Sequence, residues 1–198
     1  MKNREQRLYQ AIAALGLLAL LAFEPVRHGL ETSMLRHMLV QFPGLLVVGV
    51  LLGGLVSARW RIALARWNHL GISGLCATGA FLAVLMIPRV LDLALVDWRV
   101  ETAKFVTLVF CGAALRLSWP ASGLIVQGFF LGNVLPMTAV VGLLYQDSPL
   151  RLCNAYTLDD QQQLGSWLIG IAVALGVAWL LHAYHVLKDK NESEPSHA

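Results

Sequence analysis

The clearest candidates for chemistry in this chain are a histidine and two methionines close to one another, Met34, His37 and Met38. Their spacing of three and four residues puts all three side chains on one face if the segment is helical. Thioether and imidazole groups together suit copper, and methionine favours the cuprous ion. His28 lies one short loop earlier and is a further candidate ligand. The pattern predicts a copper site. The alternative is that the methionines face lipid or pack, and that His37 is an ordinary interfacial residue.

The most polar stretch between two apolar segments, residues 147–163, contains the second group of candidates. Cys153 is the one cysteine outside the apolar segments, and it belongs to no CxxC pair. A lone thiol in an oxidising compartment indicates a metal ligand, a transient redox site or a bond to another chain. The alternative is a thiol that packs as a small hydrophobe. Asp159, Asp160 and Gln161 are further outer-face candidates, and we expect one aspartate to cap the helix that follows.

A third group of candidates, Glu101 and Lys104, lies three residues apart at the expected start of a helix. At the membrane interface the two side chains would pair with each other and contribute little stability. Buried among helices, they would form a functional site. The interfacial pair is the favoured interpretation.

Composition shows what kind of protein must position these residues. Hydrophobic residues are 57% of the 198, and charged residues are 14%. Typical soluble domains have about 45–50% and about 25%, so lipid must cover the excess apolar surface. The net charge of +3 gathers on no single segment, which argues against nucleic acid as a partner. The sequence has no Ser/His/Asp order, Gly-rich phosphate loop or HExxH motif, so no enzyme is predicted.

We therefore predict an all-α, polytopic membrane helix bundle that forms a single domain over residues 1–186, followed by a polar cytoplasmic tail, 187–198, that we expect to be disordered. Gly49, Gly53 and Gly54 allow another helix to approach the second span closely. Phe23 and the two residues after it do not resemble a signal-peptide cleavage site, so the first apolar run is interpreted as a retained span. The predicted spans are 8–26, 36–56, 69–88, 103–119, 122–145 and 164–186.

The distribution of Lys and Arg predicts the orientation. With the N-terminus inside, nine of these residues fall on cytoplasmic segments and six on outer segments, while acidic residues divide four to eight. Both termini are therefore expected in the cytoplasm of a bacterial inner membrane. The candidate residues His28, His37, Glu101 and Cys153 all fall at the outer face in this arrangement.

Three short segments, 33–46, 86–92 and 160–165, resemble the membrane-integral CtaG family of bacterial cytochrome c oxidase assembly proteins. They follow the family's order over about residues 33–170: an early histidine-bearing helix, a proline-containing helix exit and a DQ-x-x-G helix entry. The resemblance implies a role in oxidase maturation, with copper supplied to the outer-face copper centre. It points first to His37, and then to Asp160 and Gln161. The chain departs from the family in having Glu101 and Lys104 where members usually carry histidines, and in being shorter.

The predicted function is accordingly a non-enzymatic assembly factor for a respiratory copper oxidase, with oxidase subunits or a copper carrier as partners. An alternative is a structural or haem-binding electron-transfer subunit, in which His69 and either His182 or His185 would hold the haem between two helices. A third is a small-solute transporter, which is disfavoured because the sequence has no internal repeat.

Overall fold

The computed structural model describes residues 2–193, and all of their regular secondary structure is helical, as predicted. A π-helical turn, His37–Gln41, joins α3 to α4, and short 3₁₀ turns, His69–Gly71 and Trp119–Ala121, precede α6 and follow α8. The helices are α1 (Lys2–Ala22), α2 (Glu24–Glu31), α3 (Met34–Arg36), α4 (Phe42–Leu55), α5 (Ala58–Trp67), α6 (Ile72–Leu85), α7 (Pro88–Val96), α8 (Trp98–Ser118), α9 (Leu124–Asp147) and α10 (Leu158–Ser193).

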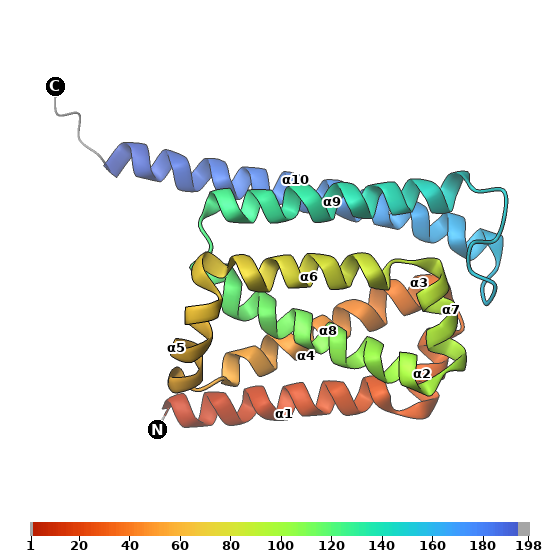
Figure 1. The fold of residues 1–198 in the computed structure, drawn as a ribbon, viewed down its shortest axis with the longest axis horizontal. Helices are drawn as coiled ribbons and strands as arrows, with labels where there is room; N and C mark the ends of the chain where they lie inside the picture. Colours follow the sequence, from red (N-terminus) through yellow and green to blue (C-terminus); the bar gives the residue numbers. More distant parts are fainter. Residues whose placement is uncertain (1, 194–198) are drawn as a thin grey trace.

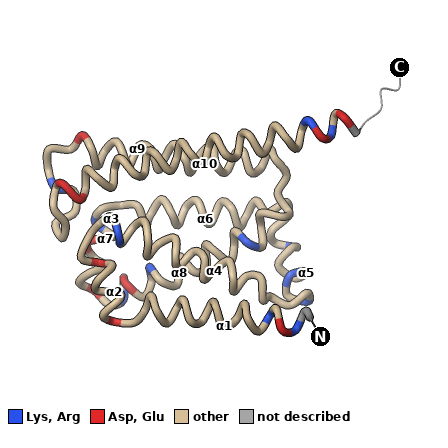
Figure 2. Tube along the Cα trace, turned by 180° about the vertical axis from the view of Figure 1, so that it is seen from behind, with Lys and Arg blue, Asp and Glu red and all other residues tan. Residues whose placement is uncertain are grey.

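The long helices run back and forth along one direction, and the start of α1 and the end of α10 lie at the same side of the molecule (Figure 1). We call this side the terminal end; α5 lies across it. The opposite side, the loop end, gathers α2, α3, α7 and the 148–157 loop between α9 and α10. Figure 2 shows that charged residues concentrate toward the two ends, while the middle of the bundle is almost free of them.

Three helical segments are long and apolar enough to cross a membrane: Met34–Leu55, Leu124–Asp147 and Leu158–Glu192. Two bent pairs raise the number to five if each is one span. In these pairs α1 meets α2 at 65°, and α5 meets α6 with its preceding turn at 69°. The chain is thus a multi-pass membrane protein by the length and apolarity of its helices.

The predicted span 103–119 covers most of α8 and the first residue of the turn after it, and α8 is not among the apolar segments. The helix has the length of a span, but Arg99, Glu101, Lys104 and Arg116 lower its hydropathy. At the other end of the chain, α10 continues to Ser193, so the predicted polar tail 187–198 is helical as far as the structure describes it. Residues 194–198 lie outside the described range.

The core around α4 and α8 depends on glycines at the point where the two helices cross. A Cβ atom on Gly49 would overlap the carbonyl oxygen of Val109, and one on Gly112 would overlap that of Leu46. Backbone therefore packs against backbone here, and the predicted close approach to Gly49 is confirmed. This contact brings the start of α8 against the segment that carries His37.

Substitution of Gly49 by alanine should destabilise the protein by about 1–3 kcal/mol, because a backbone atom, unlike a flexible side chain, cannot move aside. The matched control is Gly170→Ala on α10, where nothing lies within 4 Å of the added methyl group. Thermal unfolding of both variants in detergent checks this. Equal midpoints for the two variants would contradict the packing of α4 on α8.

Candidate functional site

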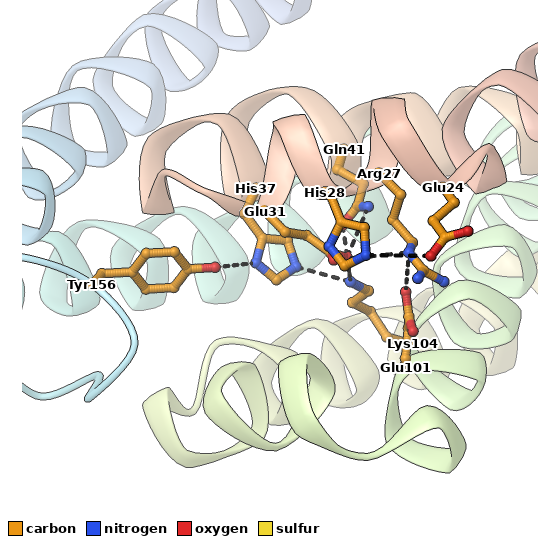
Figure 3. Close-up of polar contacts among 9 residues, drawn as sticks. All are labelled: Glu24, Arg27, His28, Glu31, His37, Gln41, Glu101, Lys104 and Tyr156. Atoms are coloured by element: carbon orange, nitrogen blue, oxygen red, sulfur yellow. Dashed lines mark hydrogen bonds and ion pairs between the residues drawn. The ribbon is translucent and has the colours of Figure 1, made fainter.

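Lys104 on α8 is the centre of a buried polar cluster at the loop end (Figure 3). Its side chain is 1% exposed. The ammonium group donates to Glu31 Oε1 at 3.0 Å, to Gln41 Oε1 at 2.9 Å and to His37 Nε2 at 2.9 Å. An ammonium has three N–H groups and no acceptor. All three are therefore used, each by a different residue.

His37 is completely buried, and both of its ring nitrogens are engaged. Nε2 faces an ammonium, which can only donate, so Nε2 must be the acceptor of that bond. The ring proton then resides on Nδ1, which donates to the Tyr156 hydroxyl at 2.6 Å. His37 is therefore a neutral imidazole held in one tautomer by Lys104 on one side and Tyr156 on the other.

The π-helical turn His37–Gln41 positions the two neutral members of the cluster. Pro43 is the second residue after the turn; it cannot donate a backbone hydrogen bond, and its ring would clash with the carbonyl of Leu39 in a regular α-helix. The wider turn relieves this clash, and π turns of this kind often mark functional sites. His37 and Gln41 both reach Lys104 from this single turn.

Arg27, Glu31 and Glu101 complete the charge balance of the cluster. Arg27 Nε lies 3.1 Å from Glu101 Oε1 and 4.0 Å from Glu31 Oε2. Gln41 also donates to Glu31 Oε1, at 3.2 Å. Two cations thus face two carboxylates, and the neutral His37 adds no charge. We call the whole set the Lys104 network: Arg27, Glu31, His37, Gln41, Glu101, Lys104 and Tyr156.

Asp160 connects α10 to α3 beside this network. Its carboxylate accepts from the Ser33 hydroxyl at 3.2 Å and from the backbone N–H of Met34 at 3.3 Å, so it caps α3. The expectation that an aspartate caps α10 is wrong for Asp160. Thr157 does so instead, because its hydroxyl accepts from the backbone N–H of Asp160 at 3.2 Å. Asp159 is exposed at the first turn of α10.

Gln161 holds the 148–157 loop from inside the protein. Its Oε1 accepts from the backbone N–H of Leu152 at 2.7 Å, and its Nε2 donates to the carbonyl of Tyr145 at 3.1 Å. Asp92 on α7 holds the same loop by accepting from the backbone N–H of Asn154 at 2.9 Å. These contacts fix the loop and, with it, the position of Tyr156.

Cys153 lies in the same loop, is 1% exposed, and directs its thiol toward the carbonyl oxygen of Pro88 at 3.7 Å. Burial, together with the negative charge of Asp92, raises the pKa of this thiol to about 12. A thiol that stays protonated near neutral pH is a poor nucleophile and a poor metal ligand. This is the geometry of the packing alternative, in which Cys153 serves as a small apolar residue.

The five predicted copper ligands do not form one set. Met34, Met38 and Cys153 belong to a single apolar core cluster beside His37. His28 lies outside it, largely exposed, with Nε2 3.8 Å from Glu24. His37 has no free nitrogen, and copper bound to Nε2 would replace a cation, Lys104, that already occupies the position. In this arrangement the residues do not fit a resident copper ion, and copper binding stays a prediction.

The described residues contain no group of three or more His, Cys, Asp and Glu side chains arranged to hold a metal ion. The histidines considered for haem are exposed: His69 in the turn before α6, and His182 and His185 near the end of α10. His185 lies edge-on to the neighbouring Tyr184 ring. Haem binding likewise stays a prediction.

Sequence reasoning identified three members of the network, His37, Glu101 and Lys104, but paired the last two with each other. In the structure Glu101 pairs with Arg27, and Lys104 with Glu31. Four members were missed: Arg27, Glu31, Gln41 and Tyr156. One signal was present, since Arg27 and Glu31 are four residues apart, as are His37 and Gln41, and residues at this spacing share a helical face. No neighbouring residue in the sequence indicates that Tyr156 belongs to the network, because its partner His37 is 119 residues away.

Comparisons with protein-family models, with curated proteins and with solved structures find no match to this chain.

Replacing Lys104 by methionine should destabilise the protein by about 3–5 kcal/mol, because it leaves a buried carboxylate without its counter-charge. The double variant Lys104→Met/Glu31→Gln removes both charges and should recover part of this loss. Thermal or denaturant unfolding in detergent, in a double-mutant cycle, measures the coupling. If the two single effects simply add, Lys104 and Glu31 are not paired in the membrane-embedded protein.

The raised pKa of Cys153 predicts slow alkylation of the folded protein. The thiolate is the reactive form, so the rate at pH 8 should be lower by about three orders of magnitude than in the unfolded chain. It should still rise through pH 11, without the plateau expected near an ordinary thiol pKa. Mass spectrometry of the Cys153 peptide after timed exposure to iodoacetamide checks both points. Fast labelling at pH 8 would show that the loop leaves the thiol open.

Proposed function

We propose that this protein is a multi-pass inner-membrane assembly factor for a respiratory copper oxidase, and that it acts through its loop end. One observation carries the proposal: the three segments that resemble the CtaG family lie far apart in the sequence and are held together at this end. Asp160 in the third bonds to Ser33 and Met34 in the first. Asp92 and Pro88 in the second bond to the loop that leads into the third.

The Lys104 network supports a role in holding a surface in a fixed shape. Each charge within it has a partner of opposite sign, so none is available to a substrate without breaking a buried pair. Its members come from α2, the π turn, the start of α8 and the 148–157 loop, which all lie at the loop end (Figure 1), and this argues against a proton path across the membrane. A rigid, non-enzymatic docking surface for an oxidase subunit fits these contacts best.

The same network supports six crossings with both termini in the cytoplasm. α8 has 21 residues, and at about 1.5 Å per residue it is as long as the hydrocarbon core is thick. Lys104 and Glu101 near its start are paired with Glu31 and Arg27, which reduces the cost of placing them in the membrane. With α8 counted and one crossing in each bent pair, the chain crosses six times. The distribution of Lys and Arg then puts both termini in the cytoplasm and the loop end outside.

Copper delivery is the more specific form of this proposal. Met34 and Met38 lie in the apolar core next to His37. The two thioethers and the imidazole could bind a cuprous ion together only if the Lys104 ammonium moved away from His37 Nε2. Because His37 is completely buried, alanine at this position would leave a cavity and would leave Lys104 and Tyr156 each without a hydrogen-bond partner. His37→Gln is therefore a better test than His37→Ala, because glutamine can accept from Lys104 and donate to Tyr156.

The test measures assembled oxidase in cells that lack this protein, from the haem absorbance and copper content of their membranes. Wild-type protein should restore the oxidase, and His28→Ala, outside the network, should restore it equally. If the imidazole of His37 is itself needed, His37→Gln should restore the oxidase several-fold less well at an unchanged membrane level of the protein, whereas a purely rigid surface should tolerate the change. If copper supply is the task, added copper should shrink this defect. Normal oxidase in the deletion strain would refute the proposed function.

A further inference from the structure

Helix α5, at the terminal end, is exposed along its whole length although seven of its ten residues are apolar. Trp67 is 85% exposed and Trp60 is 66% exposed. Arg59, Arg61 and Arg66 are exposed as well, and none forms an ion pair within the part of the chain that the structure describes. Neither water nor the protein interior suits such a helix.

The residues of α5 form a stripe bordered by charge. At about 100° per residue, Trp60, Leu64 and Trp67 share one face. Arg59 and Arg66 lie together about 100–120° to one side of that face, and Arg61 lies about 100° to the other side. Of the large apolar residues of α5, Ile62 is the one on the opposite side. A helix with tryptophan on one face and arginine at both edges lies in the plane of a membrane interface, with rings at headgroup level.

The corner between α5 and α6 holds this orientation. Gly71 has φ of 72°, and a Cβ there would overlap the carbonyl oxygen of Ser118 on α8. Asn68 accepts from the backbone N–H of Gly74 at 2.9 Å and donates to the Ser118 hydroxyl at 2.9 Å. Because α6 runs along the bundle and α5 is bent 69° from it, α5 lies close to the membrane plane (Figure 1).

The positive charge of the α5 surface indicates a negatively charged partner. The sequence has no acidic residue between Glu31 and Asp92, so the three arginines have no internal counter-charge nearby along the chain. Guanidinium groups bind phosphate in a two-pronged geometry, and basic residues at a membrane surface attract anionic lipid. Arg7 of α1 also reaches this end, where it donates to the carbonyl of Leu55.

We propose that α5 is a binding surface for anionic phospholipids, with Arg59, Arg61 and Arg66 on the headgroup phosphates and Trp60, Leu64 and Trp67 among the upper acyl chains. The surface lies at the opposite end of the molecule from the Lys104 network. It does not depend on oxidase assembly or on which leaflet the helix occupies.

The test uses full-length protein in phosphatidylcholine bilayers, with spin-labelled phosphatidylglycerol and spin-labelled phosphatidylcholine as probes. The protein should retain phosphatidylglycerol several-fold more strongly at low salt, and less so as salt rises. The triple variant Arg59→Gln/Arg61→Gln/Arg66→Gln should lose roughly fivefold or more of this preference. The charge-matched control Arg89→Gln/Arg99→Gln/Arg151→Gln, exposed at the loop end, should keep it.

A second readout does not depend on the arginines. Phosphatidylglycerol brominated near the headgroup should quench the tryptophan fluorescence of the wild-type protein more than that of Trp60→Phe/Trp67→Phe. Two results would overturn the proposal. One is a wild-type protein with no preference for phosphatidylglycerol, as expected if α5 instead docks another protein. The other is an arginine-free α5 that keeps the preference.

Discussion

Burying the ammonium of Lys104 requires three acceptors at fixed positions, since an isolated charge in so apolar a setting costs several kcal/mol. The acceptors come from two places, Glu31 at the end of α2 and the π turn that carries His37 and Gln41. This requirement sets the packing of the loop end. Glu31 on α2 must pack against α8, and the π turn before α4 must face the interior of the protein. Nδ1 of His37 is then bonded by Tyr156 from the 148–157 loop. The loop is held in its turn by Gln161 and Asp92.

The sequence was a good guide to the apolar helices because the membrane imposes a simple length rule. The ranges 36–56 and 122–145 differ by only a few residues from Met34–Leu55 and Leu124–Asp147. The rule fails where a helix lies flat or carries charge. Hydropathy alone did not resolve α2, α5 and α7 as separate short helices. Charged residues also keep α8 below the apolarity of a span, and their pairing with residues elsewhere in the chain cannot be read from hydropathy.

The candidate site was harder to predict because its pairs are distant in sequence. Spacing placed Met34, His37 and Met38 on one face, and all three are buried at the loop end. Spacing also led to the prediction that Glu101 pairs with Lys104, the opposite charge nearest to it in that helix. Arg27 and Glu31 compete for these side chains, and the fold of α2 against α8 decides the outcome. The role of Asp160 was missed for the same reason, since the helix it caps begins 126 residues before it. The two ends also differ in charge: the loop end pairs its buried charges internally, while α5 leaves its arginines outward.

The protonation state of His37 tests the central claim most directly, because it is set by Lys104. Nitrogen-15 NMR of the ring, in membrane-reconstituted protein labelled at histidine, distinguishes the two neutral tautomers and the cation. His37 is identified by the signal lost in His37→Gln. A network centred on the Lys104 ammonium predicts a neutral ring with the proton on Nδ1 and an unprotonated Nε2 near neutral pH. A proton on Nε2, in the other tautomer or in the doubly protonated ring, would contradict it.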